Sequence, residues 1–235
     1  MIGVILAAGM AKRLRPLTDE RPKCLLKVGQ RTLLQRTVDA VVEAGIDELV
    51  VVTGYRNNMI VDFLKANYPA LNVHFIDNPD YAHNNNIFSL WLTRPYTEGK
   101  DFLLLDSDIL FDPAIIPTIV RQEGSVLALN RHELGEEEIK VIVDSEGYVK
   151  EISKICSIQE AIGESVGIEK MGGHKVCDCA GRCACPRFFS QPDCDIGWDS
   201  SRNLYFPNQW SKTTAFQAVI TFSSFFPVFL NCSGI

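Results

Sequence analysis

Residues 2–18 decide the fold, and they read IGVILAAGMAKRLRPLT. A short apolar run, Ile2–Leu6, that passes into small residues is typical of a buried parallel strand. Ala7, Ala8 and Gly9 then allow the backbone to approach a ligand closely, and their N–H groups can contact phosphate oxygens. The sequence therefore predicts a buried strand that ends in an anion-binding loop.

The loop that follows this strand is rich in positive charge. It contains Lys12, Arg13, Arg15, Arg21, Lys23 and Lys27. Cations beside a small-residue loop favour a polyanionic phosphate ligand, for which Arg13 supplies a fixed charge and Lys23 a flexible one. The loop is neither a Walker loop nor a G-x-G-x-x-G dinucleotide loop, because the glycines and lysine of those motifs are absent.

Strand-like and helix-like segments alternate from residue 1 to about residue 171. The expected strands are 2–6, 49–52, 73–76, 102–105, 126–129, 139–143, 148–152 and 165–168, and the expected helices are 33–44 and 58–67. Glu146-Gly147 predicts a hairpin turn. This alternation predicts a Rossmann-like, three-layer α/β/α sandwich with a mostly parallel, doubly wound sheet that is incomplete at its C-terminal end.

Length and composition exclude several classes of protein. The chain has 235 residues, 46% hydrophobic and 22% charged, which is enough for a real core and argues against disorder, collagen and coiled coil. The net charge of −6 disfavours nucleic-acid binding. The apolar stretch from Phe216 to Leu230 is shorter than the roughly twenty residues that a spanning helix needs. With no basic leader visible, we expect a cytoplasmic protein without a membrane span.

A second cluster, Asp106-Ser107-Asp108, follows the expected strand 102–105. Ligands of open α/β sheets lie beyond the carboxyl ends of the strands. A carboxylate placed there can hold Mg²⁺ against triphosphate oxygens. A surface turn with acidic capping residues is the alternative interpretation.

The third segment, residues 78–91, contains the consecutive residues Asn84, Asn85 and Asn86. Their amides suit the recognition of a base edge or a ribose. They could equally cap the helix that begins near Ile87.

The N-terminal segment resembles the L-A-A-G-x-G-T-R-L-x-P-L-T…P-K signature of nucleotidyltransferases that join nucleoside triphosphates to sugar phosphates or phospho-alcohols. Ala11 stands where the family usually has glycine, and Lys12 where it often has threonine. The pattern around Asn85, Asn86 and Ser89 looks like the corresponding stretch of bacterial phosphocholine cytidylyltransferases, which activate phosphocholine for surface polysaccharides. The resemblance covers about residues 1–171.

This resemblance implies roles for individual residues. Leu6, Ala7, Ala8 and Gly9 would hold the nucleotide, together with Asn85, Asn86 and Ser89. Arg13 would contact the leaving pyrophosphate, and Lys23 the α-phosphate and the acceptor. Asp108 would be the magnesium ligand with Asp106 as a supporting acid, while Lys154 and Glu164 would face the acceptor. A second metal-binding Asp from a later strand, usual in the family, has no assignment here.

The remaining residues, 172–235, form an atypical tail. They contain six of the eight cysteines, eleven of the 22 aromatic residues and no Glu. Three interpretations compete: a small metal-binding module, an irregular subdomain, or sequence that is out of frame or disordered. The spacing of Cys177, Cys179, Cys183 and Cys185 is tight for one tetrahedral zinc ion. We therefore expect a nucleotidyltransferase domain over 1–171 and a separate tail over 172–235.

Three functions follow as hypotheses. The first is a Mg²⁺-dependent cytidylyltransferase that joins CTP to phosphocholine or a similar small phosphorylated acceptor and releases pyrophosphate. The second is a sugar-1-phosphate nucleotidyltransferase, and the third is an inactive nucleotide-binding fragment. The sequence does not determine the oligomeric state, and a homodimer is compatible with it.

Overall fold

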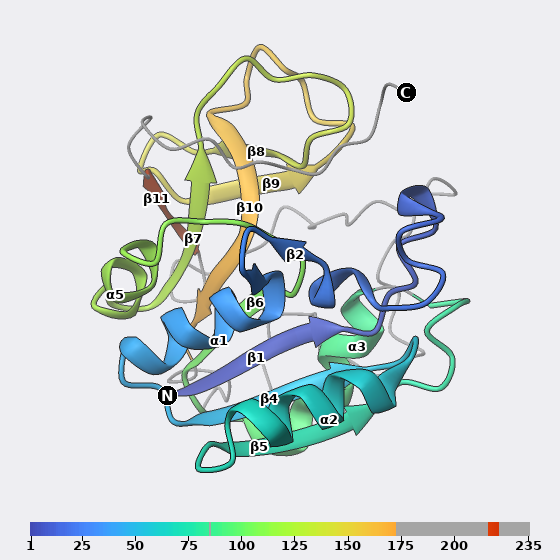
Figure 1. The fold of residues 1–235 in the computed structure, drawn as a ribbon. Helices are drawn as coiled ribbons and strands as arrows, with labels where there is room; N and C mark the ends of the chain where they lie inside the picture. Colours follow the sequence, from blue (N-terminus) through green and yellow to red (C-terminus); the bar gives the residue numbers. More distant parts are fainter. Residues whose placement is uncertain (85, 173–215, 221–235) are drawn as a thin grey trace.

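The computed structural model describes residues 1–84, 86–172 and 216–220 (Figure 1). These residues form a nine-stranded sheet whose main path runs β11-β7-β10-β6-β1-β4-β5. The strands of this path are β1 (Ile2–Ala7), β4 (Glu48–Thr53), β5 (Asn72–Asp77), β6 (Phe102–Asp106), β7 (Ser125–Asn130), β10 (Gly163–Met171) and β11 (Phe216–Ile220). All eight strands expected from the sequence are present, with ends that differ by at most three residues.

The sheet is mostly parallel, as the alternation of elements predicts. β1 pairs in parallel with β4 and β6, β4 with β5, and β7 with β11. β10 is antiparallel to both β6 and β7 and lies between them. β8 (Lys140–Val143) and β9 (Val149–Ser153) form an antiparallel hairpin that joins the sheet where β8 pairs with the start of β10. Gly147 closes this hairpin at a φ of +84°, which confirms the predicted turn.

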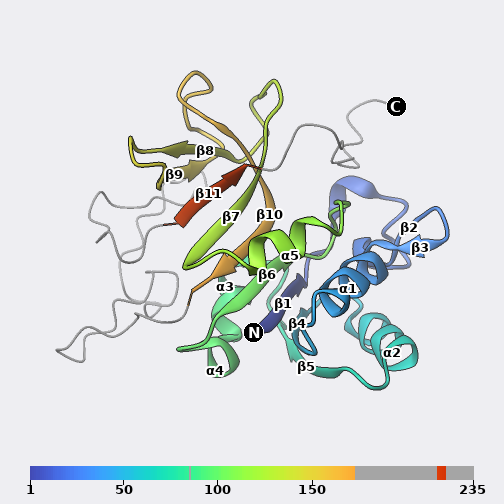
Figure 2. The ribbon, with the colours of Figure 1, turned by 90° about the vertical axis from the view of Figure 1, so that its left-hand side faces the viewer.

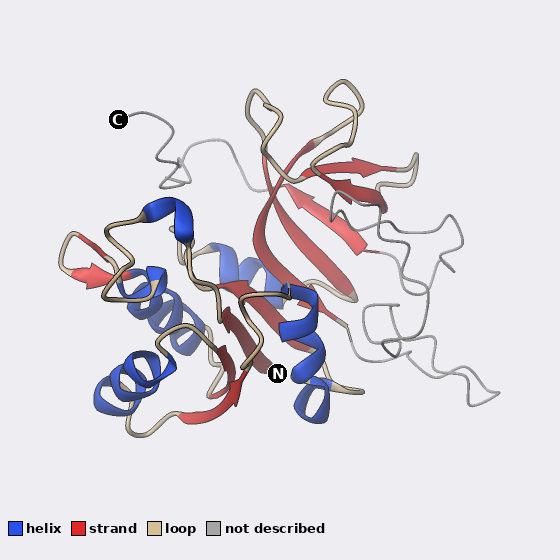
Figure 3. Ribbon diagram, turned by 90° about the vertical axis from the view of Figure 1, so that its right-hand side faces the viewer, coloured by secondary structure: helices blue, strands red, loops and turns tan. Residues whose placement is uncertain are grey.

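Helices cover both faces of the sheet, so the three-layer architecture is confirmed (Figure 2). One face packs against α1 (Leu33–Glu43), α2 (Asn57–Asn67) and α5 (Ile115–Val120). The other packs against α3 (Asn86–Leu92), with the short α4 (Arg94–Thr97) following it. The colouring of Figure 3 shows the helices on either side of the strands. Within the described ranges, no helix has the length and apolar character needed to cross a membrane.

Helix α1 shows how local sequence determines one of these elements. Leu34, Val38 and Val41 recur at helical spacing and are fully buried against the sheet. Thr32 caps the first turn, because its Oγ1 accepts a hydrogen bond from the Gln35 N–H at 3.0 Å. Gly45 ends the helix in the left-handed conformation at a φ of +83°, one residue after the predicted end of the helix.

The chain after residue 171 was predicted least well. β11 extends the sheet beside β7, and no strand was expected there from the sequence. The remainder of the tail, including the cysteines from Cys177 to Cys185, lies outside the described residues. The incomplete C-terminal end of the sheet and the division at residue 171 therefore stay predictions.

Candidate active site

The predicted loop and the acidic cluster meet at one edge of the sheet. β1 and β6 are adjacent and parallel, with Leu6 paired to Asp106 in their register. The loop that leaves β1 and the acidic cluster that follows β6 therefore begin at the same level. This is the carboxyl edge, where open α/β sheets bind ligands.

The small residues of the loop leave space beside the backbone. Leu6, Ala7 and Ala8 are buried in the core, so their main chain rather than their side chains is available to a ligand. Gly9 is exposed, and a Cβ built on it would meet no atom within 4 Å. Gly9 is therefore not required by packing within the described structure, and the open space beside it can admit a ligand.

Ala11 adopts the left-handed conformation, with a φ of 48° and a ψ of 51°. Its carbonyl oxygen accepts hydrogen bonds from the Leu14 N–H at 3.0 Å and from the Thr18 Oγ1 at 3.1 Å. These bonds hold the peptide in an orientation that glycine adopts without strain and alanine does not. The loop thus has a glycine-like backbone although the residue is alanine.

Residues that follow β4 anchor the far end of this loop, and the sequence alone did not reveal them. The Tyr55 hydroxyl lies 2.9 Å from the carbonyl oxygens of both Thr18 and Asp19. Arg56 Nη2 donates to the Asp19 carbonyl oxygen at 2.7 Å. Because β4 is next to β1, these bonds fix the loop against the sheet from its other side.

Lys23 and Asp108 form the central ion pair of the site, with Nζ and Oδ2 2.7 Å apart. Lys23 begins the short 3-10 helix Lys23–Leu25, whose next two residues, Cys24 and Leu25, are buried in the core. Burial raises the pKa of the Cys24 thiol to about 12, so this cysteine acts as an anchor rather than a nucleophile. Each charge of the pair is the counter-ion of the other, and both side chains remain partly exposed.

Asp106 lies deeper than Asp108. Burial raises the pKa of its carboxyl to about 8, the negative charges of Asp108 and Glu169 add to this, and Lys23 opposes it. Burial likewise raises the pKa of Glu169 to about 7. The end of β6 therefore carries more carboxylates than cations to balance them.

Gly167 makes room for Asp106. Strand β10 has an irregularity between Ser165 and Glu169, and within it Gly167 has a φ of +73°. A Cβ on Gly167 would lie 2.5 Å from Asp106 Oδ2, which is closer than real contacts allow. The bulge at Gly167 thus leaves room for the Asp106 carboxylate. The sequence did not predict this need for glycine, because Gly167 and Asp106 are far apart in the chain.

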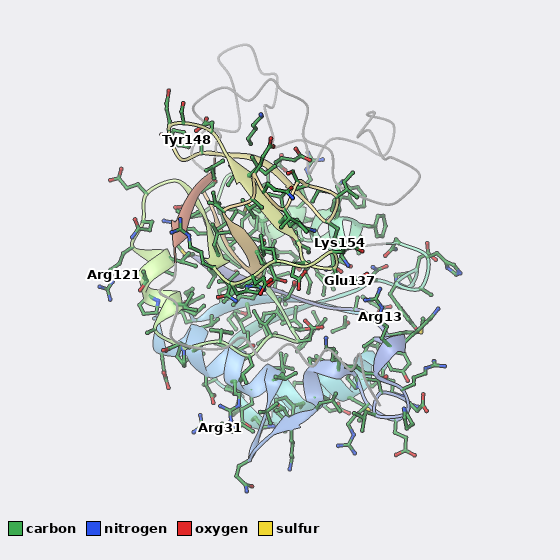
Figure 4. All side chains as sticks on the ribbon, turned by 90° about the horizontal axis from the view of Figure 1, so that it is seen from above. Arg13, Arg31, Arg121, Glu137, Tyr148 and Lys154 are labelled. Carbon is green, nitrogen blue, oxygen red and sulfur yellow. The ribbon has the colours of Figure 1, made fainter. Side chains whose placement is uncertain are left out.

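Glu137 brings Arg13 and Lys154 together. Its Oε2 lies 3.1 Å from Lys154 Nζ and 3.9 Å from Arg13 Nη1. In Figure 4 the three residues lie together on one side of the molecule, apart from Arg31, Arg121 and Tyr148. The hydrogen bond from Lys154, followed by the charges of Lys154 and Arg13, lowers the pKa of Glu137. Arg13 and Lys154 were predicted separately, and Glu137, which links them, was not.

The asparagine segment is organised by Asn78 at the end of β5. Its fully buried amide donates to Asn84 Oδ1 at 2.9 Å and to Ser89 Oγ at 3.0 Å, and Asn84 Nδ2 donates back to Asn78 Oδ1. Ser89 is thus buried and engaged with Asn78. Asn86 is exposed and is the first residue of α3, and Asn85 lies outside the described residues.

Glu164 is buried at the start of β10, directly across from Lys140 of β8. Its Oε2 accepts no hydrogen bond within the described structure, and His132 Nε2 lies 3.6 Å from it. Burial raises the pKa of Glu164 to about 7, Glu138 adds to the effect, and Lys140 opposes it. Among the described residues, no contact therefore joins Glu164 to Asp106, Asp108 or Lys23.

Comparison with known proteins identifies the family of the chain. A family model described as nucleotidyl transferase matches residues 2–125. The choline-phosphate cytidylyltransferase of Streptococcus pneumoniae is 37% identical over 108 residues, which are 46% of this chain and 44% of that protein. The UTP–glucose-1-phosphate uridylyltransferase of Haloferax volcanii is 32% identical over 125 residues, 52% of this chain and 49% of that protein. The chain thus spans less than half the length of these two relatives.

Among solved structures, that of the CTP:phosphocholine cytidylyltransferase from Streptococcus pneumoniae superimposes with a TM-score of 0.55 at 25% identity. The superposition covers 73% of this chain and 71% of that one. The match of the family model extends over more than half of the chain, from the first strand through the loop and the acidic cluster. The chain belongs to the nucleotidyl transferase family.

Proposed function

We propose that this protein is a Mg²⁺-dependent cytidylyltransferase that transfers the CMP group of CTP to a small phosphorylated acceptor such as phosphocholine. The observation that carries the proposal is the Lys23–Asp108 pair, 2.7 Å across, at the carboxyl edge of β1 and β6 and beside the open loop at Gly9. A cation and a carboxylate at this place suit a triphosphate and its magnesium ion.

The reaction needs positioning and charge neutralisation more than acid–base chemistry. An oxygen of the acceptor phosphate attacks the α-phosphorus of the triphosphate, a new P–O bond forms, and the bond to the departing pyrophosphate breaks. The attacking oxygen is already negatively charged, so no general base is required. The barrier is the repulsion between anions and the charge that develops on the leaving group.

The residues divide this work by position. The main chain from Ala7 to Gly9 holds the nucleotide, Lys23 neutralises the α-phosphate and the incoming acceptor, and Arg13 neutralises the leaving pyrophosphate. Lys154 holds the acceptor phosphate. In the structure Glu137 contacts both Arg13 and Lys154, so it keeps the two cationic ends of this path close to one another.

The carboxylates at the end of β6 suit a magnesium ion. Asp106 and Asp108 are hard oxygen ligands, and Mg²⁺ in nucleotide sites is commonly held by one or two carboxylates plus substrate phosphates. A divalent cation would also balance the excess negative charge around Asp106. When bound, the ion would neutralise triphosphate oxygens. Within the described ranges no group of three or more His, Cys, Asp or Glu side chains is placed to hold a metal ion, so an ion here would complete its coordination with phosphate oxygens and water.

Two features favour CTP and a small acceptor. The segment around Asn86 and Ser89 resembles phosphocholine cytidylyltransferases, and a phosphocholine enzyme is among the relatives in both sequence and structure. A sugar-1-phosphate nucleotidyltransferase is the second candidate, because a uridylyltransferase for glucose 1-phosphate matches a similar share of the chain.

The test is pyrophosphate release by the full chain with Mg²⁺. CTP, UTP, ATP, GTP and dTTP are each combined with phosphocholine, phosphoethanolamine, 2-aminoethylphosphonate and glucose 1-phosphate, and Asp108→Asn serves as the background control. We expect turnover with CTP and an amino-alcohol acceptor, and we expect Asp108→Asn to abolish it. Turnover confined to glucose 1-phosphate would establish the second candidate. Nucleotide binding without turnover in any combination would mean an inactive fragment.

A further inference from the structure

Within the described ranges, two lysines are buried and form no ion pair with a carboxylate. Lys140 in β8 is 1% exposed and Lys170 in β10 is 5% exposed. Burying an ammonium group is costly unless its N–H donors are hydrogen-bonded. The contacts of each ammonium group therefore decide what the lysine does.

Lys140 joins two segments that carry site residues. Its Nζ donates to the carbonyl oxygens of Glu136 at 3.2 Å, Glu138 at 3.3 Å and Lys154 at 2.5 Å. These bonds use all three N–H donors of the ammonium group. Two of the carbonyls flank Glu137, and the third belongs to Lys154 itself, 14 residues further along the chain.

The ammonium thus determines where Glu137 and Lys154 meet. Fixing the peptides on both sides of Glu137 restricts its side chain to the face on which it contacts Lys154 at 3.1 Å. Fixing the Lys154 carbonyl sets the direction in which that side chain leaves the end of β9. The side chains are 42% exposed for Lys154 and 71% exposed for Glu137, so burial restrains them little.

Lys170 makes the same kind of contacts elsewhere. Its Nζ donates to the carbonyl oxygens of Val120 and Gln122, at the end of α5 and just after it. In the pairing of β10 with β6, Lys170 lies opposite Leu103, near the start of β6 and away from its acidic end. Lys170 is therefore a matched control, because it is a buried lysine bonded to carbonyls but makes no contact with Glu137 or Lys154.

We propose that Lys140 is a positioning residue that holds Glu137 and Lys154 in place to receive the acceptor phosphate. This inference rests on the proposed function, because it assigns Lys154 to the acceptor. Lys140 touches neither substrate, and its effect passes through the backbone of the two segments that it joins. Its loss should therefore weaken use of the acceptor while leaving nucleotide binding intact.

The experiment compares Lys140→Met with Lys170→Met in the full chain. With CTP and phosphocholine, or the pair that the substrate panel identifies, Lys140→Met should raise the KM for the acceptor about tenfold or more. The KM for the nucleotide should stay within about twofold of the parent value, and Lys170→Met should leave both values unchanged. If Lys140→Met does not fold, Lys140→Gln, which keeps two N–H donors, replaces it.

Amide hydrogen exchange gives a second readout that needs no turnover. The Gly135 N–H donates to Glu138 Oε2 at 2.9 Å, so it reports on the segment that Lys140 holds. Exchange at Gly135 should be faster in Lys140→Met than in the parent and in Lys170→Met. Should the parent show no turnover with any substrate pair, the proposed function fails, and the exchange result still tests the role of Lys140.

Four outcomes would overturn the inference. An unchanged acceptor KM in folded Lys140→Met would show that Lys154 does not depend on it. Equal increases in both KM values would indicate a general loss of structure. The same rise in acceptor KM in Lys170→Met would show that the effect does not depend on the position of Lys140. Unchanged exchange at Gly135 in Lys140→Met would show that Lys140 does not hold this segment.

Discussion

Replacing Ala11 with glycine should stabilise the protein. Ala11 has a φ of 48°, and the left-handed conformation costs an L-residue with a Cβ about 1–2 kcal/mol. Glycine removes that strain but loses more conformational freedom on folding, which costs roughly 0.5–1 kcal/mol. The expected net gain in the free energy of unfolding for Ala11→Gly is therefore about 0.5–1 kcal/mol.

The assay is urea unfolding of the full chain, with thermal unfolding as a second measure. For a protein of this size, each kcal/mol corresponds to roughly 2–4 °C in Tm. Ala66→Gly is the matched control, because Ala66 is exposed and lies within helix α2. The same substitution there should destabilise the protein by about 0.5–1 kcal/mol.

The two variants should thus have opposite signs although they remove the same methyl group. A loss of stability in Ala11→Gly equal to that in Ala66→Gly would refute the assignment of strain to the loop. Because the hydrogen bonds to the Ala11 carbonyl oxygen do not involve its side chain, the loop geometry should be retained. Turnover by Ala11→Gly should accordingly match that of the parent.

Three further predictions concern charge and space at the site. Lys23→Met should lower kcat about a hundredfold or more in steady-state assays, because it removes the charge that neutralises the α-phosphate. Lys65→Met, on the exposed face of α2, should match the parent. Retained turnover in Lys23→Met would refute the mechanism. Gly167→Ala should lower the free energy of unfolding by about 2 kcal/mol or more in urea, because its Cβ would lie 2.5 Å from a carboxylate oxygen at a positive φ. Folded Glu164 keeps a proton that the unfolded chain releases above the ordinary glutamate pKa of 4.5. The free energy of unfolding should therefore fall as the pH rises from 4.5 to about 7, by on the order of 3 kcal/mol in all. If Glu164→Gln lost as much stability over this pH range as the parent, the prediction would be contradicted.

Much of the site could be predicted because its main parts are contiguous in sequence. A strand that empties into a small-residue, basic loop is visible in residues 2–18, and so is the acidic end of β6 in its own segment. The rule that parallel strands present their carboxyl ends at one edge then placed Asp106 and Asp108 near Lys23, and the 2.7 Å contact between Lys23 and Asp108 agrees with it. The hydrogen bond from Asn78 to Ser89 could not be predicted, because the two residues are eleven positions apart and only the fold brings them together.

What the structure added comes from contacts between distant segments. Glu137 had no signal of its own, because one glutamate in the run Glu136-Glu137-Glu138 looks like any solvated surface acid. Only the packing of the 131–139 segment beside the end of β9 makes it the partner of Lys154. Lys140 likewise appears in sequence as a polar interruption of a strand, and its burial depends on the carbonyls that surround it.

The sequence by itself determined the order and type of nearly every strand, the two long helices, the basic loop and the acidic strand end. These follow from periodicity and from short-range preferences that act within about a turn or a strand of the chain. Only the tertiary structure decided that β10 runs antiparallel between β6 and β7, that its bulge at Gly167 admits Asp106, and that Lys140 joins Glu137 to Lys154. Pairing partners and buried charges depend on which distant segments pack together, and local sequence carries no record of that choice.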